Sequence, residues 1–313
     1  MEDKKLEKLE KKEAQNKIKE EEKRLQDEIK EELEIEKKER KQLKKKIKEA
    51  KKEIKIAKKN KDNIDVTLVI ELKENEEKFK INEELRKKAI IRKKNNPPRL
   101  TLLEEIGNAV SHGIGSILTI LAFILLLQKS TTPKMVLASV VYSIAMFFMF
   151  TNSCLYHSWK WGSTVKRIWR RFDYTSIYLM IAGTFAPLQL IMLERVYPSF
   201  GSTLGLIYFI VMWSLVAIGI TFTAIFGPGR IRKLNFTLYF LVGWSGLILV
   251  PGFFKYGHNL LWWILGGGIV YTLGMIPFGL LRGKKGAHFV WHIVVLLGVI
   301  AHFLGIYFAI YCN

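Results

Sequence analysis

The sequence predicts an all-α protein, a polytopic bundle of seven transmembrane helices that follows a charged, mostly helical N-terminal extension. Two observations lead to this fold class. The composition changes near Pro97 and Pro98, and seven apolar runs of about 20 residues follow that point. Such runs match the length that a helix needs to cross a hydrocarbon core of about 30 Å. The expected domains are therefore residues 1–98, the extension, and residues 101–313, the membrane domain.

The extension is dominated by Lys and Glu. Over residues 1–60 the few apolar side chains recur at some spacings of four and seven, which predicts a charged helix or a weak coiled coil. Residues 64–72 alternate apolar and polar side chains, as is typical of a strand, and residues 78–81 are the expected partner in a short hairpin over 64–81.

The membrane domain contains an odd number of apolar runs, which places the two ends of the chain on opposite sides of the membrane. The runs are residues 107–128, 136–157, 173–192, 204–226, 236–254, 259–280 and 288–311. Loops 158–172, 227–235 and 281–287 together carry eleven Lys and Arg, whereas the loops on the other side carry four. Because short cytoplasmic loops retain basic residues, we expect the N-terminus inside and the C-terminus outside.

The balance of charge indicates which partners to expect. Residues 1–100 hold 34 Lys and Arg with 25 Asp and Glu, and residues 101–313 hold 15 with 4. Basic charge beside a membrane favours anionic lipid, so membrane lipid is the expected partner, with anionic headgroups at the basic cytoplasmic loops. Nucleic acid is not expected, because the interspersed glutamates cancel most of the basic field. A solvated appendage that sets spacing or association is the alternative role of residues 1–98.

Polar side chains at the ends of three predicted helices share the cytoplasmic leaflet. His288 and His292 are four residues apart, so both rings lie on one face of the last helix. His157 ends the second run, one turn after Ser153, and Asp173 begins the third. Histidine and carboxylate groups around an open position are typical of catalytic zinc. The set therefore predicts a buried metal site.

Simpler interpretations stay open for each of these residues. A single membrane histidine often makes an ordinary packing hydrogen bond, and Asp173 can pair with Arg170 or Arg171. His112, in the first helix, is either a group that hydrogen-bonds a metal ligand or a packing residue. His302, near the middle of the membrane, is expected to make an interhelical hydrogen bond.

Several segments together resemble the hemolysin III family and its relatives, the progestin and adipoQ receptors, a seven-helix superfamily that is similar to the alkaline ceramidases. The resemblance covers about residues 101–313. It rests on Glu105–Asn108 with Ser111–Gly113, Ser153–His157, Asp173 with Ile181–Pro187, and His288–His292 with His302 and Phe303.

The resemblance implies that His157, His288 and His292 bind zinc, while Asp173 and Ser153 hold or orient a zinc-bound water. It also implies the same orientation, N-terminus in and C-terminus out, and an integral protein of the bacterial cell membrane. Nothing carries over to residues 1–98, because the long Lys- and Glu-rich extension departs from the compact bacterial members.

Two functions are compatible with these features. Three histidines leave a fourth zinc position for water, whose pKa zinc can lower to about 7. That chemistry predicts a zinc-dependent hydrolase of lipid amide or ester bonds, with Asp173 as general base and Ser153 positioning water or the developing oxyanion. The alternative is a hemolysin III-type cytolytic, channel-forming or receptor-like protein in which the metal is structural. A transport channel has less support, because no chain of charges crosses the bilayer.

Overall fold

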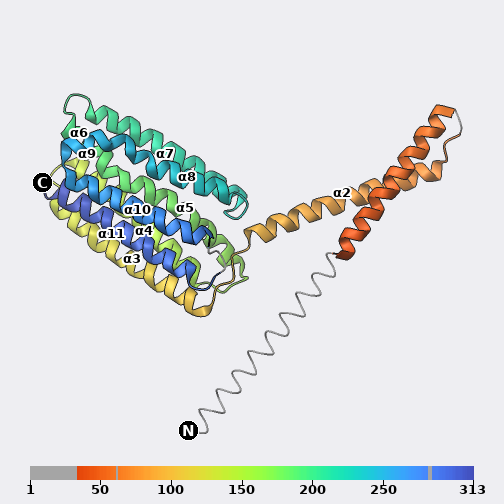
Figure 1. The fold of residues 1–313 in the computed structure, drawn as a ribbon, viewed down its shortest axis with the longest axis horizontal. Coiled ribbons are helices and arrows are strands. Elements are labelled where there is room, and N and C mark those ends of the chain that lie inside the picture. Colours follow the sequence, from red (N-terminus) through yellow and green to blue (C-terminus); the bar gives the residue numbers. More distant parts are fainter. Residues whose placement is uncertain (1–33, 61–62, 281–283) are drawn as a thin grey trace, which may run out of the picture. The chain divides into compact units, whose positions relative to one another are not determined.

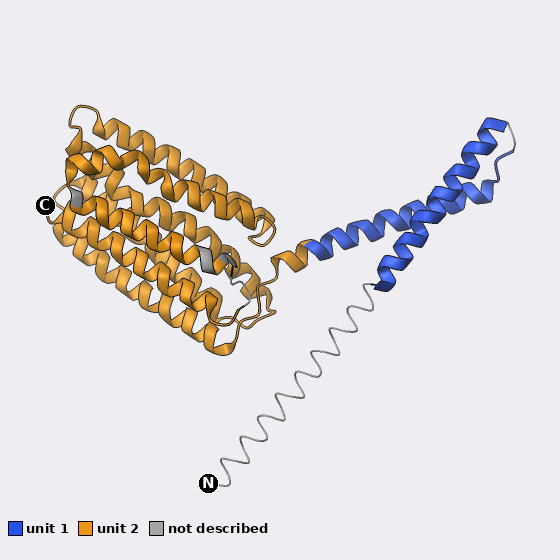
Figure 2. Cartoon of the chain, in the orientation of Figure 1, with its two compact units in different colours: residues 1–90 blue, residues 91–313 orange. Residues whose placement is uncertain are grey.

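The computed structural model describes residues 34–60, 63–280 and 284–313, and the chain divides into two compact units, residues 1–90 and 91–313 (Figures 1 and 2). Every regular element within these described ranges is helical. The prediction of an all-α protein is therefore confirmed for this part of the chain. The unit boundary falls inside α2 (Val66–Asn95), so the end of that helix belongs to the second unit.

Six helices in the described part of the second unit are long and apolar enough to cross a membrane. They are α3 (Leu102–Lys129), α4 (Pro133–Ser158), the continuous run from α5 (Thr164–Pro187) through α6 (Leu193–Val196), α7 (Gly201–Phe226), the run from α8 (Arg232–Trp244) through α9 (Val250–Tyr256), and α11 (Ala287–Ile306) with the π-helical turn η3 (Tyr307–Tyr311). A further helix, α10 (His258–Leu280), has a shorter described apolar stretch, Asn259–Met275.

The predicted third membrane helix begins earlier than its hydropathy indicates, at Thr164 instead of residue 173. The Ser163 hydroxyl caps the helix by accepting a hydrogen bond from the Lys166 N–H group. The basic residues of this segment resembled a loop in the sequence. Lys166 and Arg170 are nevertheless buried, because their head groups donate to backbone carbonyls of neighbouring segments. The first turns of α5 thus bring charged groups into the interior.

Two interruptions shape the middle of the bundle. Pro187 ends α5 and is followed by a π-helical turn, η1 (Leu188–Met192), and a 3-10 turn, η2 (Ser245–Leu249), separates α8 from α9 just before Pro251. Proline has no N–H group and cannot continue the regular hydrogen-bond pattern of a helix. Gly246 and Leu247 of η2 line a cavity in the bundle.

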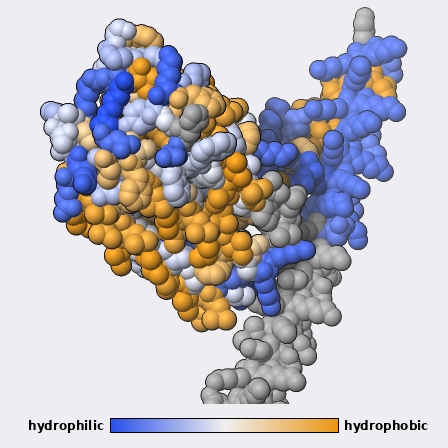
Figure 3. All heavy atoms as spheres, turned by 60° about the vertical axis from the view of Figure 1, so that its left-hand side comes forward, coloured by the Kyte–Doolittle hydropathy of each residue, from blue (hydrophilic) through white to orange (hydrophobic). Residues whose placement is uncertain are grey.

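The bundle buries α5 and exposes apolar side chains on its outer helices. In the most apolar stretch of the α5 to α6 run 78% of the residues are buried, against 22% in α7. Large apolar side chains such as Ile117, Leu121 and Ile207 are more than half exposed, and Figure 3 shows a broad hydrophobic outer surface on the bundle. Exposed apolar area of this extent indicates contact with lipid, which confirms the prediction of a membrane domain.

The extension differs from its prediction over residues 64–81. The hairpin expected over residues 64–81 is wrong, because α2 covers this segment as one helix. The Asp65 carboxylate accepts a hydrogen bond from the Thr67 N–H group at 2.8 Å and caps the helix start. The Lys and Glu residues that follow have high helix propensity, whereas an isolated two-stranded hairpin is marginally stable.

Residues 34–60 form a helix that contacts α2 through ion pairs. Arg40 pairs with Glu83, and Lys51 lies 2.6 Å from Glu76. The ammonium group of Lys51, hydrogen-bonded to Glu76, lowers the pKa of the Glu76 carboxyl. None of the residues of α2 is buried, and Ile70 and Leu85 stay exposed. The described contacts are therefore those of a charged helical pair, and they give no support to the predicted coiled coil.

Candidate metal centre and cavity

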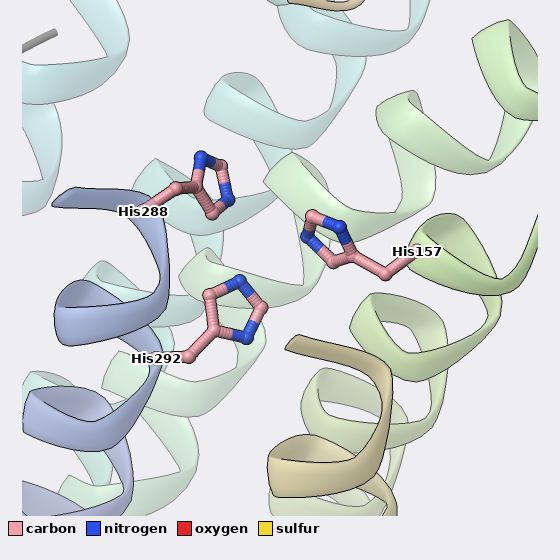
Figure 4. A group of neighbouring side chains, drawn as sticks. All are labelled: His157, His288 and His292. Carbon is pink, nitrogen blue, oxygen red and sulfur yellow. The ribbon is translucent and has the colours of Figure 1, made fainter. Parts of the chain in front are cut away.

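Three histidines from two helices meet at one end of the bundle (Figure 4). His157 lies in the last turn of α4, and His288 and His292 lie in the first two turns of α11. One ring nitrogen of each lies within 4.8 Å of those of the other two. His157 and His292 are buried and His288 is partly buried. The structure thus brings together the three residues that the sequence predicted as metal ligands.

A hydrogen bond between the Glu104 side chain and the Gly286 backbone connects the start of α3 to the start of α11. Thr101 and Glu104 form a capping box at the beginning of α3. The Glu104 carboxylate also accepts a hydrogen bond from the Gly286 N–H group at 2.5 Å, directly before α11. Gly286 has a φ angle of 82°, a left-handed conformation that glycine adopts without a steric penalty. These contacts fix the start of α11 and thereby the positions of His288 and His292, which lie in its first two turns.

His157 is oriented by the partly buried carboxylate of Glu105. Its Nδ1 atom lies 2.6 Å from Oε2 of Glu105, and the other oxygen of Glu105 lies 2.8 Å from the ammonium group of Lys166. Lys166 also donates to the backbone carbonyls of Tyr156 and Trp159, at 3.1 and 3.0 Å. A carboxylate that accepts from Nδ1–H leaves the Nε2 lone pair free for a metal ion, an arrangement that is common around metal-bound histidines.

The His157 nitrogen that faces the other two histidines has unsatisfied hydrogen-bonding capacity (Figure 4). This atom, Nε2 of His157, is buried, with no hydrogen-bond partner among the described residues. Most buried polar groups in proteins are hydrogen-bonded, so an atom of this kind needs a specific explanation. A cation that accepts its lone pair supplies one, and imidazole is a good ligand for zinc, copper, iron and nickel. The three side chains therefore fit a metal ion.

Asp173 and Ser153 lie in the cavity beside the histidines. Both line it together with His288 and His292. The Ser153 hydroxyl interacts with the Asp173 carboxyl, which lies on α5 facing α4. Asp173 does not belong to the described group of nitrogen and oxygen atoms within mutual ligand distance. Asp173 thus lies in the cavity wall, outside the group of candidate ligands.

Asp173 and His112 each had a simpler predicted role, an ion pair with Arg170 or Arg171 for Asp173 and packing for His112. Arg170 is close enough to Asp173 for an electrostatic interaction, but its Nη1 atom donates to the backbone carbonyls of Asn95 and Asn96, both at 2.9 Å. The His112 ring lies 3.9 Å from that of His292, between centroids, and also lines the cavity. His112 is therefore a direct neighbour of the candidate metal ligands.

The cavity extends from the histidines into the middle of the bundle. Its volume is about 160 Å³, and its lining is mostly apolar. Side chains of α5, α8, α10 and α11 form its walls, and His302 lies at the part furthest along α11 from His288. The Nε2 atom of His302 lies 3.0 Å from the Ile264 carbonyl oxygen, so the predicted interhelical hydrogen bond is confirmed.

Glu105 and Lys166 also belong to the site, and the sequence alone did not predict a role for either. Glu105 belongs to a segment that carries the resemblance, and Lys166 is one of the basic residues of the expected loop 158–172. The available signal was the position of Glu105 in the first turn of an apolar helix, where an unpaired carboxylate is costly. Its partners come from α4 and α5, which only the fold brings together.

Comparison with known proteins agrees with this architecture. The family model described as "Haemolysin-III related" matches residues 100–303. The chain is 36% identical over 202 residues to "Hemolysin-3" of Bacillus cereus, which covers 62% of this chain and 86% of that protein. It is 32% identical over 219 residues to "Hemolysin-3 homolog" of Bacillus subtilis (strain 168), which covers 68% and 96%. The chain is thus a multi-pass integral membrane protein and belongs to the Haemolysin-III-related family.

Proposed function

We propose that this protein is an intramembrane zinc-dependent hydrolase of lipid amide or ester bonds. One observation carries the proposal: Asp173, Ser153, His288 and His292 line one end of a mostly apolar cavity, and His157 lies within ligand distance of the two other histidines. A metal site that opens into a space for hydrocarbon suits a substrate that enters from the bilayer. Membrane lipid is accordingly the proposed substrate class.

The chemistry divides among the residues of the site. Zinc, when bound, supplies Lewis-acid activation of water at the position that the histidines leave open. A carboxylate oxygen of Asp173 accepts the proton of the attacking water and returns it to the leaving amine or alcohol. The Ser153 hydroxyl holds the Asp173 carboxylate in position. Glu105 keeps the Nδ1 atom of His157 protonated and its ring fixed.

We propose further that α10 is the seventh membrane span and that the metal site faces the cytoplasm. The three loops that begin or end near the site carry the excess of basic residues. This excess remains when Lys166 and Arg170, which are buried, are left out of the count. The same basic residues suit anionic lipid headgroups. The extension is then cytoplasmic, in a protein of the bacterial cell membrane.

The proposal is tested with detergent-purified protein by measuring metal content and turnover of a panel of fluorescent ceramides, fatty amides and fatty esters. We expect about one zinc per chain in the wild type. Asp173→Asn should retain most of the metal and lose turnover by at least about 100-fold, as expected for loss of a general base. His157→Ala should lose both.

Glu194→Gln is the matched control for Asp173→Asn. It makes the same type of change, carboxylate to amide, at the opposite end of the α5 to α6 run, where Glu194 pairs with Lys134. Turnover of this variant should equal that of the wild type. Metal-free wild-type protein, or a panel that is hydrolysed no faster by the wild type than by Asp173→Asn, contradicts the proposal.

A second candidate function is cytolysis with a structural metal, which the names of the two Bacillus relatives favour. In that case the metal connects α4 to α11, and Asp173 has no essential role. Liposomes that contain a self-quenched dye separate the two candidates. If the protein is cytolytic, the wild type and Asp173→Asn should release equal amounts of dye. If it is a hydrolase, neither should release dye from liposomes that lack its substrate.

A further inference from the structure

A second polar position lies deeper in the cavity, where Tyr271 of α10 faces His302 of α11. Both side chains line the same cavity as His292 and Asp173. His302 follows His292 by ten residues on one helix, so the two positions are about 15 Å apart along α11. Val295, between them in sequence, also lines the cavity and is apolar. Two polar positions are thus connected by a hydrophobic passage.

Glycines hold the two rings in place in a reciprocal arrangement. The His302 ring packs on Gly267, one turn before Tyr271, and the Tyr271 ring packs on Gly298, one turn before His302. A Cβ atom at either glycine would clash with the facing ring. The ring centroids lie 5.4 Å apart at an interplanar angle of 74°. The packing of α10 on α11 therefore defines the positions of both polar groups.

The hydrogen bonds already made determine what these groups can still bind. The Ile264 carbonyl can only accept, so the His302 Nε2 atom carries the hydrogen of this 3.0 Å contact. The Nδ1 atom of a neutral ring is then an acceptor. Nδ1 of His302 and the hydroxyl of Tyr271 are both buried, with no hydrogen-bond partner in the described part of the chain. His302 as a whole is 7% exposed.

We infer that Tyr271 and His302 bind a hydroxyl group carried partway along the hydrocarbon chain of a lipid. A hydroxyl can donate to Nδ1 of His302 and accept from the Tyr271 hydroxyl at the same time. A carbonyl oxygen can satisfy only Tyr271, and a methylene group satisfies neither. The inference rests on the proposed function, because it places the lipid's scissile bond at the metal centre. The substrates are then lipids with a chain hydroxyl about 15 Å from that bond.

The test is a binding experiment on the purified full-length protein with zinc bound. Stearic acid and hydroxystearic acids that differ only in hydroxyl position compete with the fluorescent fatty acid cis-parinaric acid. We expect one positional isomer, or two adjacent ones, to bind about 3- to 10-fold more tightly than stearic acid, the gain expected from about one net hydrogen bond. Isomers with the hydroxyl elsewhere should bind no better than stearic acid.

Tyr271→Phe keeps the ring on Gly298 and removes only the hydroxyl. It should abolish the positional preference and leave the affinity for stearic acid unchanged. Tyr307→Phe makes the same change on η3, outside the cavity lining, and should keep the preference. The inference is overturned if none of the acids displaces cis-parinaric acid, if no isomer binds more tightly than stearic acid, or if the preference persists in Tyr271→Phe.

The experiment also separates this inference from the proposed function. Binding at equilibrium does not require turnover, so a positional preference in a protein that hydrolyses nothing supports the subsite and contradicts the hydrolase. Hydrolysis without any positional preference supports the hydrolase and contradicts the subsite. A water molecule that permanently bridges Tyr271 and His302 predicts no preference and a lower melting temperature for Tyr271→Phe, and that result overturns the inference.

Discussion

Glu105 lies between two groups that depend on it, with one carboxylate oxygen on Lys166 and the other on His157. Lys166 has no exposed side-chain surface, and Glu105 retains 14% of its own. A buried ammonium group without a counter-charge is strongly destabilising. The same carboxylate also fixes the ring that presents Nε2 to the proposed metal position. Stability and metal affinity therefore share one residue and can be separated by mutation.

Glu105→Gln should weaken metal binding about 10- to 100-fold, the usual effect of losing the hydrogen-bond partner of a metal-bound histidine. It should also lower the free energy of unfolding by roughly 3 kcal/mol, because Lys166 loses its counter-charge while buried. Competition with a chromophoric chelator measures the first effect, and thermal unfolding in detergent measures the second.

The double variant Glu105→Gln/Lys166→Met distinguishes the two roles. Removing the ammonium group should restore most of the stability, because no unpaired charge is left inside, while metal binding stays weak. Recovery of metal affinity in the double variant would mean that Glu105 acts on the metal only through overall stability.

Among individual residues, the sequence predicted the three histidines but not the carboxylate that orients His157. Spacing of four residues along a helix is visible in His288 and His292, because helical geometry places both on one face. The pairing of His157 with Glu105 joins residues 52 positions apart on different helices. No local pattern encodes that contact.

The start of α11 shows how an element positions the site. Gly286 precedes the helix in a left-handed conformation, and its N–H group donates to Glu104. Nothing lies within 4 Å of a Cβ atom built on Gly286, so a larger side chain meets no steric obstacle there. Any effect of substitution must come from the backbone conformation. This makes the position suitable for a clean test.

Gly286→Ala should destabilise the protein by about 1 kcal/mol or more, because a residue with a Cβ atom pays a penalty in the left-handed region. It should also reduce metal affinity, since His288 lies only two residues after Gly286. The control is Gly266→Ala in α10, which likewise has open space around a Cβ atom but no positive φ. That variant should be as stable as the wild type or slightly more stable. Equal effects of the two substitutions on metal affinity would refute a role for the Gly286 conformation.

Hydropathy predicted the membrane helices well where apolar residues reach the helix ends, and poorly where they do not. The first turns of α5 contain Lys166 and Arg170, which look like loop residues until their carbonyl partners are known. The strand pattern of residues 64–72 failed for a related reason. Alternation over a few residues was outweighed by the long helix-favouring sequence that follows it.

Whole-molecule topology depends on α10. Six spans are long and apolar enough within the described residues, and the described apolar stretch of α10 covers Asn259–Met275. If α10 also crosses the membrane, as proposed, the extension and the C-terminus lie on opposite sides. If it does not, an even number of crossings returns both to the same side. The two cysteines of the chain make this difference measurable, since Cys312 is exposed near the C-terminus and Cys154 lies in α4.

Cys312 in a Cys154→Ala background should react with a membrane-impermeant maleimide added to intact cells. A cysteine introduced at exposed Lys55, in a chain with Cys154→Ala and Cys312→Ala, should react only after the cells are permeabilised. Seven crossings with a cytoplasmic N-terminus predict this pair of results, because the odd number separates the ends and the basic loops hold the extension inside. Labelling of both positions from outside, or of neither, requires an even number of crossings. That outcome would remove α10 from the set of spans.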